Sequence, residues 1–500
     1  MNENKQIKIG AIISYLAIFI SISTGILYTP WMIKTIGTSD YALYTLAMSL
    51  INTFMLDFGL STAAQRYITK YLAEKKQDSV NNVVGLIYKL YFFIAFIIFI
   101  IFFVLFCFVE NIYTELTSSE IEKFRIIYII AAAYSILSFP FIPLNGMLSA
   151  YEKFIQLKLC DLINKLLSVG LTIAALIAGY GVYSLVLVHL FAGIIFIIVR
   201  LLIIKRNTPI KPNFRYTNQA LLKDLFSFSL WSSASTLALR FMLSLAPSIL
   251  GIISGSKEIA IFGYAVSLES YVYTFVTAIN GFFLPKLSRI SVTQDSKKES
   301  EDVTQLMISV GRFILILFSL IFFGFLSLGL EFINLLFGAE YQNSYYCVLL
   351  ICGYGIVAYP QQIANTYVLV ENKVKIKAIL SLIAFVIDLI LSFLLGSIWG
   401  AIGVSLAIFI SLTILTISLN IFYQKKLHLN MKKFFKECHL KLLPGILIYA
   451  FASISIQFIP LNGFVGFFIK IFCSCCIFFL IVWFLMLTKQ EKAFILKKGK

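Results

Sequence analysis

The chain has 500 residues, of which 60% are hydrophobic, 16% aromatic and only 13% charged, with a mean hydropathy of +0.92. This composition lies far from that of soluble proteins and excludes a large soluble domain, because the interruptions between the apolar stretches are too short to bury a core of their own. In lipid the backbone must close its hydrogen bonds within helices, so the sequence predicts an all-α polytopic membrane protein.

About 20 apolar residues make one crossing of a bilayer, and the chain contains fourteen such stretches. The first follows a basic N-terminus but is too long for a signal peptide and has no small-residue cleavage site after it, so we interpret it as a retained helix. The predicted spans are residues 10–33, 40–63, 83–109, 124–147, 158–179, 183–204, 225–252, 259–284, 305–329, 343–368, 376–396, 399–422, 441–459 and 464–487.

Basic connections between these spans divide the chain into parts. The linker after the sixth span contains Pro209 and Pro212, which favour a hinge there. The predicted parts are an N-terminal six-helix lobe at 1–206, a cytoplasmic linker at 207–224, a C-terminal six-helix lobe at 225–424, a basic cytoplasmic loop at 425–440, an additional helix pair at 441–487 and a cytoplasmic tail at 488–500.

The net charge of +17 is distributed unevenly across the predicted membrane. When basic residues close to a span end are counted with the adjoining loop, 32 of the 41 Lys and Arg residues lie on the side that carries both termini, 4 in the opposite loops and 5 inside spans. This positive-inside pattern predicts that both termini lie in the cytoplasm. It explains the charge, together with attraction to anionic membrane lipids, better than a nucleic-acid site does. The eight cysteines have no metal-ligand spacing with histidine, so we expect neither a disulfide nor a metal.

An internal repeat relates the two predicted lobes. Each copy has six spans, an even number, so the copies share one orientation and an axis along the membrane normal is expected to relate them. The matched pairs are Glu152 with Glu371 and Gly181 with Gly400, at an offset of 219, and Pro140 with Pro360 and Tyr134 with Tyr354, at an offset of 220.

Several short motifs are shared with one known superfamily. They are Gly37 to Tyr44 (GTSDYALY), Asp57 to Leu60 (DFGL) followed by Arg66, Gly146 to Lys153 (GMLSAYEK), and Phe337 to Tyr341 (FGAEY). In these motifs the chain resembles the polysaccharide flippases of the multidrug/oligosaccharidyl-lipid/polysaccharide exporter superfamily, the Wzx-type O-antigen and capsule repeat-unit translocases.

This resemblance implies a two-lobed, V-shaped fold like that of the multidrug exporters. It implies alternating access acting on an undecaprenyl-diphosphate-linked oligosaccharide, with a polysaccharide polymerase and a chain-length regulator as partner proteins. The two extra C-terminal helices are similar to those of the peptidoglycan-precursor flippases, where they accompany a lipid-binding groove. No cofactor is implied, and the energy source is a gradient of H⁺ or Na⁺ or the membrane potential.

Most charged residues inside the spans have a simple structural interpretation. Lys89, Arg312 and Lys470 lie near the ends of their spans, where long basic side chains reach the interface by snorkelling. Asp161 and Lys165 are four residues apart on one helix face, so a local ion pair and a functional site are equally consistent with them.

Three charged residues lie at mid-depth. Arg240 is about 22 Å along its helix, Asp388 about 18 Å along its own and Glu269 about 15 Å from the outer face, within a core about 30 Å thick. An arginine at this depth costs about 2.5–3.5 kcal/mol on insertion scales, so it needs a partner or a watery cavity. Either the three neutralise one another, or they form a site.

If they form a site, the cations and the acids have different roles. Arginine donates paired, charge-assisted hydrogen bonds to a diphosphate, so Arg240 is the first substrate-binding candidate, followed by the cations Lys165 and Arg66. The acids Glu269, Asp388 and Asp57 are candidates for taking up the coupling ion. His189 lies inside the sixth span, where a core position is a simpler interpretation than a proton relay.

The predicted function is translocation of a lipid-linked sugar repeat unit, for O-antigen or capsule, across the inner membrane. The rivals of the same fold are a multidrug exporter, which usually has twelve spans and favours acids, and a lipid II flippase. A membrane polymerase or ligase is the rival of another class. It needs catalytic residues in a large outer loop, and the longest predicted outer loop has about a dozen residues. The sequence has no GxxxxGK[ST] motif for ATP.

Overall fold

The computed structural model describes residues 25, 28–54, 60–151, 153–277, 287, 290, 296–371, 373–489 and 491–493. Within these residues helices make up nearly all of the secondary structure and no β-strand is present, which confirms the predicted all-α class. Ten helices in this part of the chain are long and apolar enough to cross a membrane.

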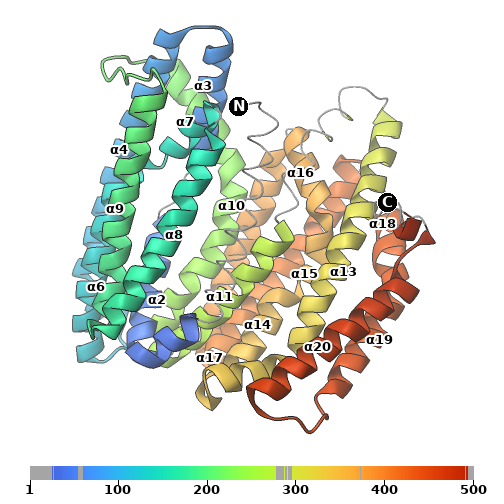
Figure 1. Cartoon of the computed structure of the whole chain (residues 1–500). Helices are drawn as coiled ribbons and strands as arrows, with labels where there is room; N and C mark the ends of the chain where they lie inside the picture. Colours follow the sequence, from blue (N-terminus) through green and yellow to red (C-terminus); the bar gives the residue numbers. More distant parts are fainter. Residues whose placement is uncertain are drawn as a thin grey trace. The chain divides into compact units, whose positions relative to one another are not determined.

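The helices follow the predicted spans in order (Figure 1). The first unit contains α2 (Thr38–Phe54), α3 (Leu60–Ala73), α4 (Gln77–Cys107), α5 (Val109–Ile112), α6 (Ser118–Ser138), η1 (Phe139–Phe141), α7 (Leu144–Ala150), α8 (Phe154–Ile177), α9 (Gly181–Asn207), α10 (Gln219–Ile253) and the start of α11 (Ser256–Thr277). The second contains the rest of α11 and then α13 (Ser296–Leu336), η3 (Ala339–Tyr341), α14 (Asn343–Gly353), α15 (Gly355–Ala358), η4 (Tyr359–Gln361), α16 (Gln362–Val370), α17 (Val374–Lys426), α18 (Met431–Phe434), η5 (Phe435–Leu440), α19 (Lys441–Ile456), α20 (Gly463–Ile481) and η6 (Val482–Met486).

The predicted number of fourteen spans stays a prediction. Most of the first predicted span lies outside the described residues. The 53 residues of α17 contain two predicted spans, because the helix breaks at Gly400, with φ 56° and ψ −132°. The Lys373 ammonium donates to the Lys426 carbonyl at 2.8 Å, so the two ends of α17 meet and its arms form a hairpin.

The chain forms two compact units, Met1–Gly263 and Tyr264–Lys500. The division falls within α11 and not in the linker at 207–224, because α10 packs against α2 and α3 of the first unit. The predicted lobes, linker, basic loop and tail are defined by the repeat and by charge, and their boundaries stay predictions.

Equivalent breaks in the two halves support the internal repeat. A 3-10 turn interrupts the membrane helix at Pro140 and again at Pro360, within η1 and η4. Proline lacks the N–H that would continue the helix, so the same break recurs at the same position of each copy. Gly181 and Gly400 both have positive φ, 60° and 56°, a conformation that glycine adopts without strain.

One predicted anchor of the repeat is displaced by one residue. The amide of Tyr151 donates to Met147 and that of Lys153 to Leu148, and the same pattern recurs 220 residues later in Glu371 and Lys373. Glu371 therefore corresponds to Tyr151 and not to Glu152. The offset changes from 220 to 219 only after this turn, so one copy is one residue shorter between this turn and the bend at Gly181 and Gly400.

A carboxylate joins three helix ends on the predicted outer side of the first unit. Glu120 of α6 accepts hydrogen bonds from the Ser39 hydroxyl at 2.6 Å and from the Thr117 amide at 3.0 Å. It also accepts one from the hydroxyl of Ser256, the first residue of α11. We call these four residues the Glu120 clasp. It holds the starts of α2, α6 and α11 together.

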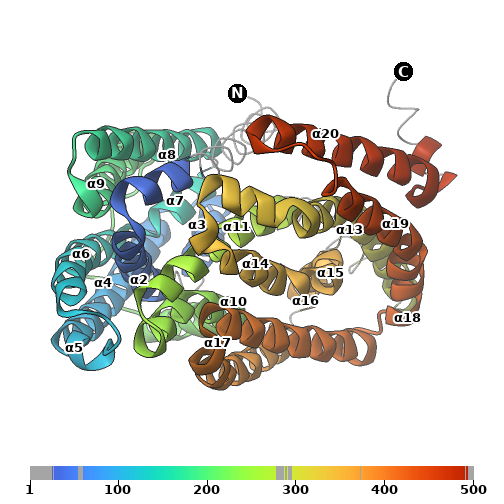
Figure 2. The ribbon, with the colours of Figure 1, turned by 90° about the horizontal axis from the view of Figure 1, so that it is seen from below.

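Arg312 anchors the C-terminal helix pair to α13 of the second unit, where α19 and α20 lie along that helix (Figure 2). Its guanidinium donates to both carboxylate oxygens of Glu491, at 2.9 and 3.1 Å, and to the carbonyls of Glu437 at 3.1 Å and Met486 at 2.7 Å. Those carbonyls belong to the π-helical segments η5 and η6. Arg312 is 5% exposed, so the predicted snorkelling to the interface is wrong.

Lys470 and Lys89 also have acceptors within the protein. The Lys470 ammonium pairs with Glu331 at 3.0 Å, and the Lys89 ammonium donates to the Tyr216 carbonyl at 3.0 Å. Snorkelling is wrong for Lys470, which is 4% exposed, because Glu331 of α13 lies within its reach. Lys89 ties α4 to the linker that precedes α10.

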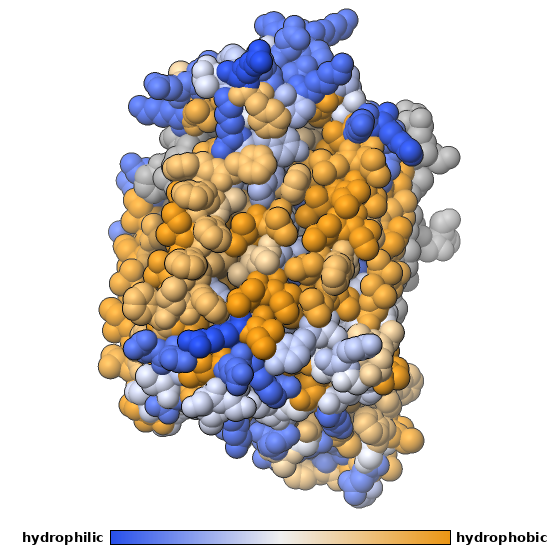
Figure 3. Space-filling model, turned by 90° about the vertical axis from the view of Figure 1, so that its left-hand side faces the viewer, coloured by the Kyte–Doolittle hydropathy of each residue, from blue (hydrophilic) through white to orange (hydrophobic). Residues whose placement is uncertain are grey.

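A broad apolar surface covers the side of the first unit shown in Figure 3, between polar ends. In this unit α4, α6, α8 and α9 expose large apolar side chains, among them Phe93, Phe96, Ile129, Ile163, Phe191 and Ile198. A largely apolar surface of this kind is what a membrane-spanning unit presents to lipid.

We predict that Glu491→Gln loosens the C-terminal helix pair. Burial raises the pKa of Glu491, but hydrogen bonds from Arg312 and Thr488 lower it by more, and the net pKa lies below its usual 4.5. A lowered pKa in the folded state stabilises the protein above the unfolded pKa, and this stability is lost as the pH falls through the folded value. We expect the variant to lose about 1–3 kcal/mol of unfolding free energy at neutral pH.

Thermal unfolding of the purified protein measures this loss. The difference from the unmodified protein should disappear at acidic pH, where Glu491 is protonated. The control is Glu340→Gln, which removes an exposed carboxylate. An equal effect of both variants, or a difference that persists in acid, contradicts the role of the Arg312–Glu491 pair.

Candidate functional site

Glu269 is buried beside a cluster of aromatic side chains in the second unit. It is 4% exposed and accepts a hydrogen bond of 3.4 Å from the hydroxyl of Tyr359 in η4. The rings of Tyr354, Tyr273 and Phe318 surround that of Tyr359, with centroids 5.6, 6.3 and 5.0 Å away. A buried carboxylate with one long hydrogen bond is costly when ionised, so this position favours a proton or a bound cation.

Asp388 lies on the first arm of the α17 hairpin and is 2% exposed. Its Oδ1 atom has no hydrogen-bond partner among the described residues, and the same holds for the hydroxyls of Ser392 and Ser411. Counted from the bend, Asp388 and Ser411 are about 18 and 16 Å along their arms at 1.5 Å per residue. The hairpin therefore carries buried oxygen atoms at one depth without the donors that would satisfy a carboxylate.

Arg240 is exposed on α10, within the apolar helix at 233–253. It forms no ion pair with any residue that the structure describes. Arg240 belongs to the first unit and Glu269 to the second, so mutual neutralisation of the two stays a prediction. A mid-depth arginine needs either a partner or a polar environment. The described residues supply no charged partner.

Asp161 does not pair with Lys165, so that alternative is wrong. Asp161 accepts a hydrogen bond of 2.6 Å from Arg200 of α9 and lies 3.8 Å from Lys158. Lys165 is exposed, one turn further along α8 and within electrostatic reach of His189. His189 is exposed as well, with its ring edge-on to Tyr134 at 5.0 Å, so the predicted core position is wrong.

Sequence reasoning missed Arg200. The residue lies near the end of a predicted span, and by position alone it belongs with the basic residues of the adjoining loop. The signal that could have identified it is the pairing of α8 with α9, because antiparallel neighbours joined by a short turn place Arg200 opposite Asp161. Of the remaining predicted site residues, Arg66 is exposed on α3, and Asp57 lies outside the described residues.

A model of one protein family matches more than half of the chain. The family is described as "Polysaccharide biosynthesis protein", and the match covers residues 7–291. The chain belongs to this family. The sequence resemblance to polysaccharide flippases is thereby confirmed at the level of the family.

A curated relative of this polysaccharide biosynthesis protein is the capsular polysaccharide biosynthesis protein CapF of Staphylococcus aureus. The two are 33% identical over 156 residues, which is 30% of this chain and 37% of the relative. The match therefore spans little more than a third of the relative's length.

Solved structures place the fold among membrane transporters. The lipid II flippase MurJ, in an inward closed conformation, matches with a TM-score of 0.74 and 15% identity over 94% of this chain and 97% of its own. An inward-facing multidrug resistance transporter of the MATE family, within the MOP superfamily, matches with a TM-score of 0.63 and 14% identity over 83% and 99%. These likenesses confirm the predicted exporter-like fold of this multi-pass membrane protein.

We predict that the melting temperature of the protein depends on H⁺ or Na⁺ and that Asp388→Asn removes this dependence. A ligand that binds only the folded state raises the melting temperature, so a cation bound at Asp388 would stabilise the unmodified protein. Melting should be compared in sodium chloride and choline chloride, at acidic and alkaline pH. The variant should melt at the same temperature or higher and lose its ion dependence, because the uncompensated carboxylate is gone.

Asp302→Asn is the matched control, since Asp302 is exposed at the start of α13. It should keep the ion dependence of the unmodified protein. Identical ion responses in the unmodified protein and in Asp388→Asn exclude Asp388 as the coupling residue.

Proposed function

We propose that this protein is a flippase that translocates undecaprenyl-diphosphate-linked oligosaccharide repeat units, for O-antigen or capsular polysaccharide, across the inner membrane by alternating access. The observation that carries the proposal is the family match over residues 7–291 in a chain with the fold of membrane transporters. A polysaccharide biosynthesis protein of this fold acts in the step that moves an intermediate across the bilayer. The substrate class also has the anionic head group that a mid-depth arginine suits.

Arg240 is the proposed contact for the diphosphate. It is exposed on a membrane helix and has no charged partner among the described residues. Its planar fork gives two parallel, charge-assisted hydrogen bonds to phosphate oxygens, which offset the desolvation of the head group. A drug exporter for cations has no use for a positive charge in this place.

Glu269 and Asp388 are the proposed ion-coupling groups of the second unit. Both are buried, with one hydrogen bond to Glu269 and an unpartnered oxygen on Asp388. Uptake of a proton or a cation neutralises a buried carboxylate, and its release restores the cost of burying the charge. The bound ion therefore changes the free energy of the unit by several kcal/mol, enough to bias a two-state transport cycle.

Deletion of the gene, with identification of the lipid-linked sugars that accumulate, tests this proposal. We expect an undecaprenyl-diphosphate-linked oligosaccharide trapped in the inner leaflet, together with loss of surface polysaccharide. Complementation with Arg240→Ala should fail although the protein is inserted, and Arg240→Lys should restore part of the export, because the charge survives and the fork is lost.

The double variant Arg240→Gln with Glu269→Gln separates a substrate site from a structural pair. If the two residues only neutralise each other, each single variant strands a charge and the double variant recovers export. Recovered export at normal protein levels removes Arg240 from the substrate site. Loss of drug resistance with normal surface polysaccharide after deletion contradicts the flippase and favours the multidrug exporter, whereas a trapped peptidoglycan precursor favours the lipid II flippase.

A further inference from the structure

α8 carries a stripe of polar side chains along one face. Lys158, Asp161, Lys165, Ser168 and Thr172 follow each other at intervals of 3, 4, 3 and 4 residues, which places them on one side of the helix. The stripe is about 21 Å long at 1.5 Å per residue, two thirds of the hydrocarbon thickness. The opposite face carries exposed apolar residues: Leu159, Ile163 and Leu166. A membrane helix with this pattern has one side for lipid and one for a polar environment.

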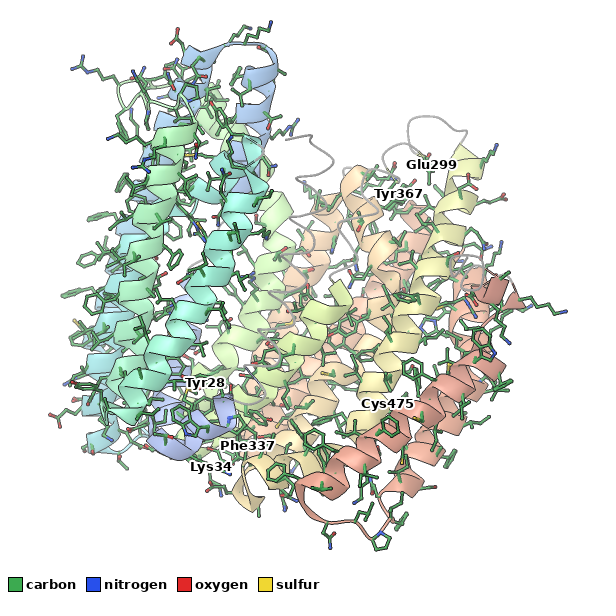
Figure 4. All side chains as sticks on the ribbon, viewed as in Figure 1. Tyr28, Lys34, Glu299, Phe337, Tyr367 and Cys475 are labelled. Atoms are coloured by element: carbon green, nitrogen blue, oxygen red, sulfur yellow. The ribbon has the colours of Figure 1, made fainter. Side chains whose placement is uncertain are left out.

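The two ends of the stripe differ. At its far end Thr172 hydrogen-bonds to Tyr28, which Figure 4 labels beside the lower part of α8. The hydroxyls of Ser168 and Thr172 find acceptors within α8, at 3.4 and 2.7 Å. At the near end Lys158 and Asp161 are only half-buried, with side-chain exposures of 43% and 42%. The charged side chains of the stripe are therefore partly exposed, whereas the hydroxyls of its uncharged part already have hydrogen-bond partners.

Arg200 of α9 faces the charged part of this stripe, since α8 and α9 lie side by side in Figure 1. Its Nη2 donates to Asp161 Oδ1 at 2.6 Å. Its Nε is buried and has no acceptor among the described residues. Nε and Nη2 form the edge of the guanidinium that binds two oxygens in parallel, so half of this edge is unused. An anion that presents two oxygens to this edge would use both donors, whereas Asp161 uses only one.

We propose that Lys158, Lys165 and Arg200 form a binding site for the diphosphate group of the lipid-linked substrate, and that Asp161 occupies Arg200 until the diphosphate displaces it. This site rests on the function proposed above. It adds to Arg240 a second binding site for the diphosphate in the first unit. The three cations and Asp161 leave a net charge of two, which matches the two charges of a diphosphate joined at both ends. When no substrate is bound, the ion pair with Asp161 keeps Arg200 from being an isolated buried charge.

The displacement of Asp161 distinguishes this site from a purely structural ion pair. In a structural pair, loss of either partner strands the other and weakens the protein. In the proposed site, Asp161 competes with the ligand, so its removal strengthens anion binding, whereas removal of Arg200 weakens it. The two variants therefore change the affinity in opposite directions.

Binding of farnesyl diphosphate to the full-length protein, in nanodiscs of neutral phosphatidylcholine, tests the site, with farnesol as the ligand that lacks the anion. We expect Arg200→Gln and Lys158→Gln to raise the Kd about tenfold or more, because each removes a charge-assisted contact. Arg200→Lys should lie between Arg200→Gln and the unmodified protein, and Asp161→Asn should lower the Kd. Arg206→Gln is the matched control, an exposed arginine near the end of the same helix.

Each remaining outcome contradicts a defined part of the account. In one outcome the unmodified protein binds the diphosphate, and Arg200→Gln and Lys158→Gln bind it as well as Arg206→Gln does. This result excludes the site and leaves the proposed function standing. Weaker binding by Asp161→Asn, with a lower melting temperature, makes the pair structural and overturns the displacement. Equal binding of farnesyl diphosphate and farnesol by the unmodified protein contradicts both the site and the proposed function. Lys158 is half-exposed, so its variant gives a result even if the Arg200 variants do not fold.

Discussion

The need to satisfy every backbone polar group inside the membrane governs this structure. A membrane helix can break only where the protein itself supplies new partners for the freed groups. The breaks occur at the matched prolines Pro140 and Pro360, at the bend of α17 and in the two π-helical segments. Arg312 donates hydrogen bonds to two carbonyls of the π-helical segments. The tyrosine that hydrogen-bonds to Glu269 lies in η4. Two groups of polar contacts in the second unit, around Arg312 and around Tyr359, therefore lie where its helices are interrupted.

The same constraint separates structural charges from candidate functional ones. Arg312, Lys470 and Lys89 each have acceptors that hold them in place, and their loss would loosen neighbouring helices. Arg240 and Asp388 differ from them, since the described residues give the arginine no charged partner and leave a carboxylate oxygen of Asp388 without a donor. Charges left unsatisfied at mid-depth are costly, and proteins keep them where an ion or a substrate completes the site.

Composition and apolar periodicity were sufficient to predict the helical class and the order of the spans, because the bilayer restricts a chain to few solutions. The repeat was visible through Pro140 and Pro360, whose chemistry forces the same break twice, but Glu152 was matched one residue out of place, since identities alone do not fix a turn. Partners between helices were not predictable. The bonds from Arg200 to Asp161 and from Arg312 to Glu491 depend on which helices are neighbours, and periodicity along one helix does not contain that information.

Alternating access is the central claim of this account, and the Glu120 clasp gives the most direct test of it. Ser39 and Ser256 both hydrogen-bond to Glu120 yet come from different predicted lobes, whose outer ends part in the proposed transport cycle.

The decisive measurement is translocation of a lipid-linked oligosaccharide in proteoliposomes by a Ser39→Cys, Ser256→Cys protein without its native cysteines, before and after cross-linking. A pair within one predicted lobe, Asp40→Cys with Lys123→Cys, replaces an ion pair of 2.7 Å and serves as the control. We predict that the first cross-link stops translocation until it is reduced and that the second does not. Undiminished translocation with a verified cross-link between residues 39 and 256 would contradict the account.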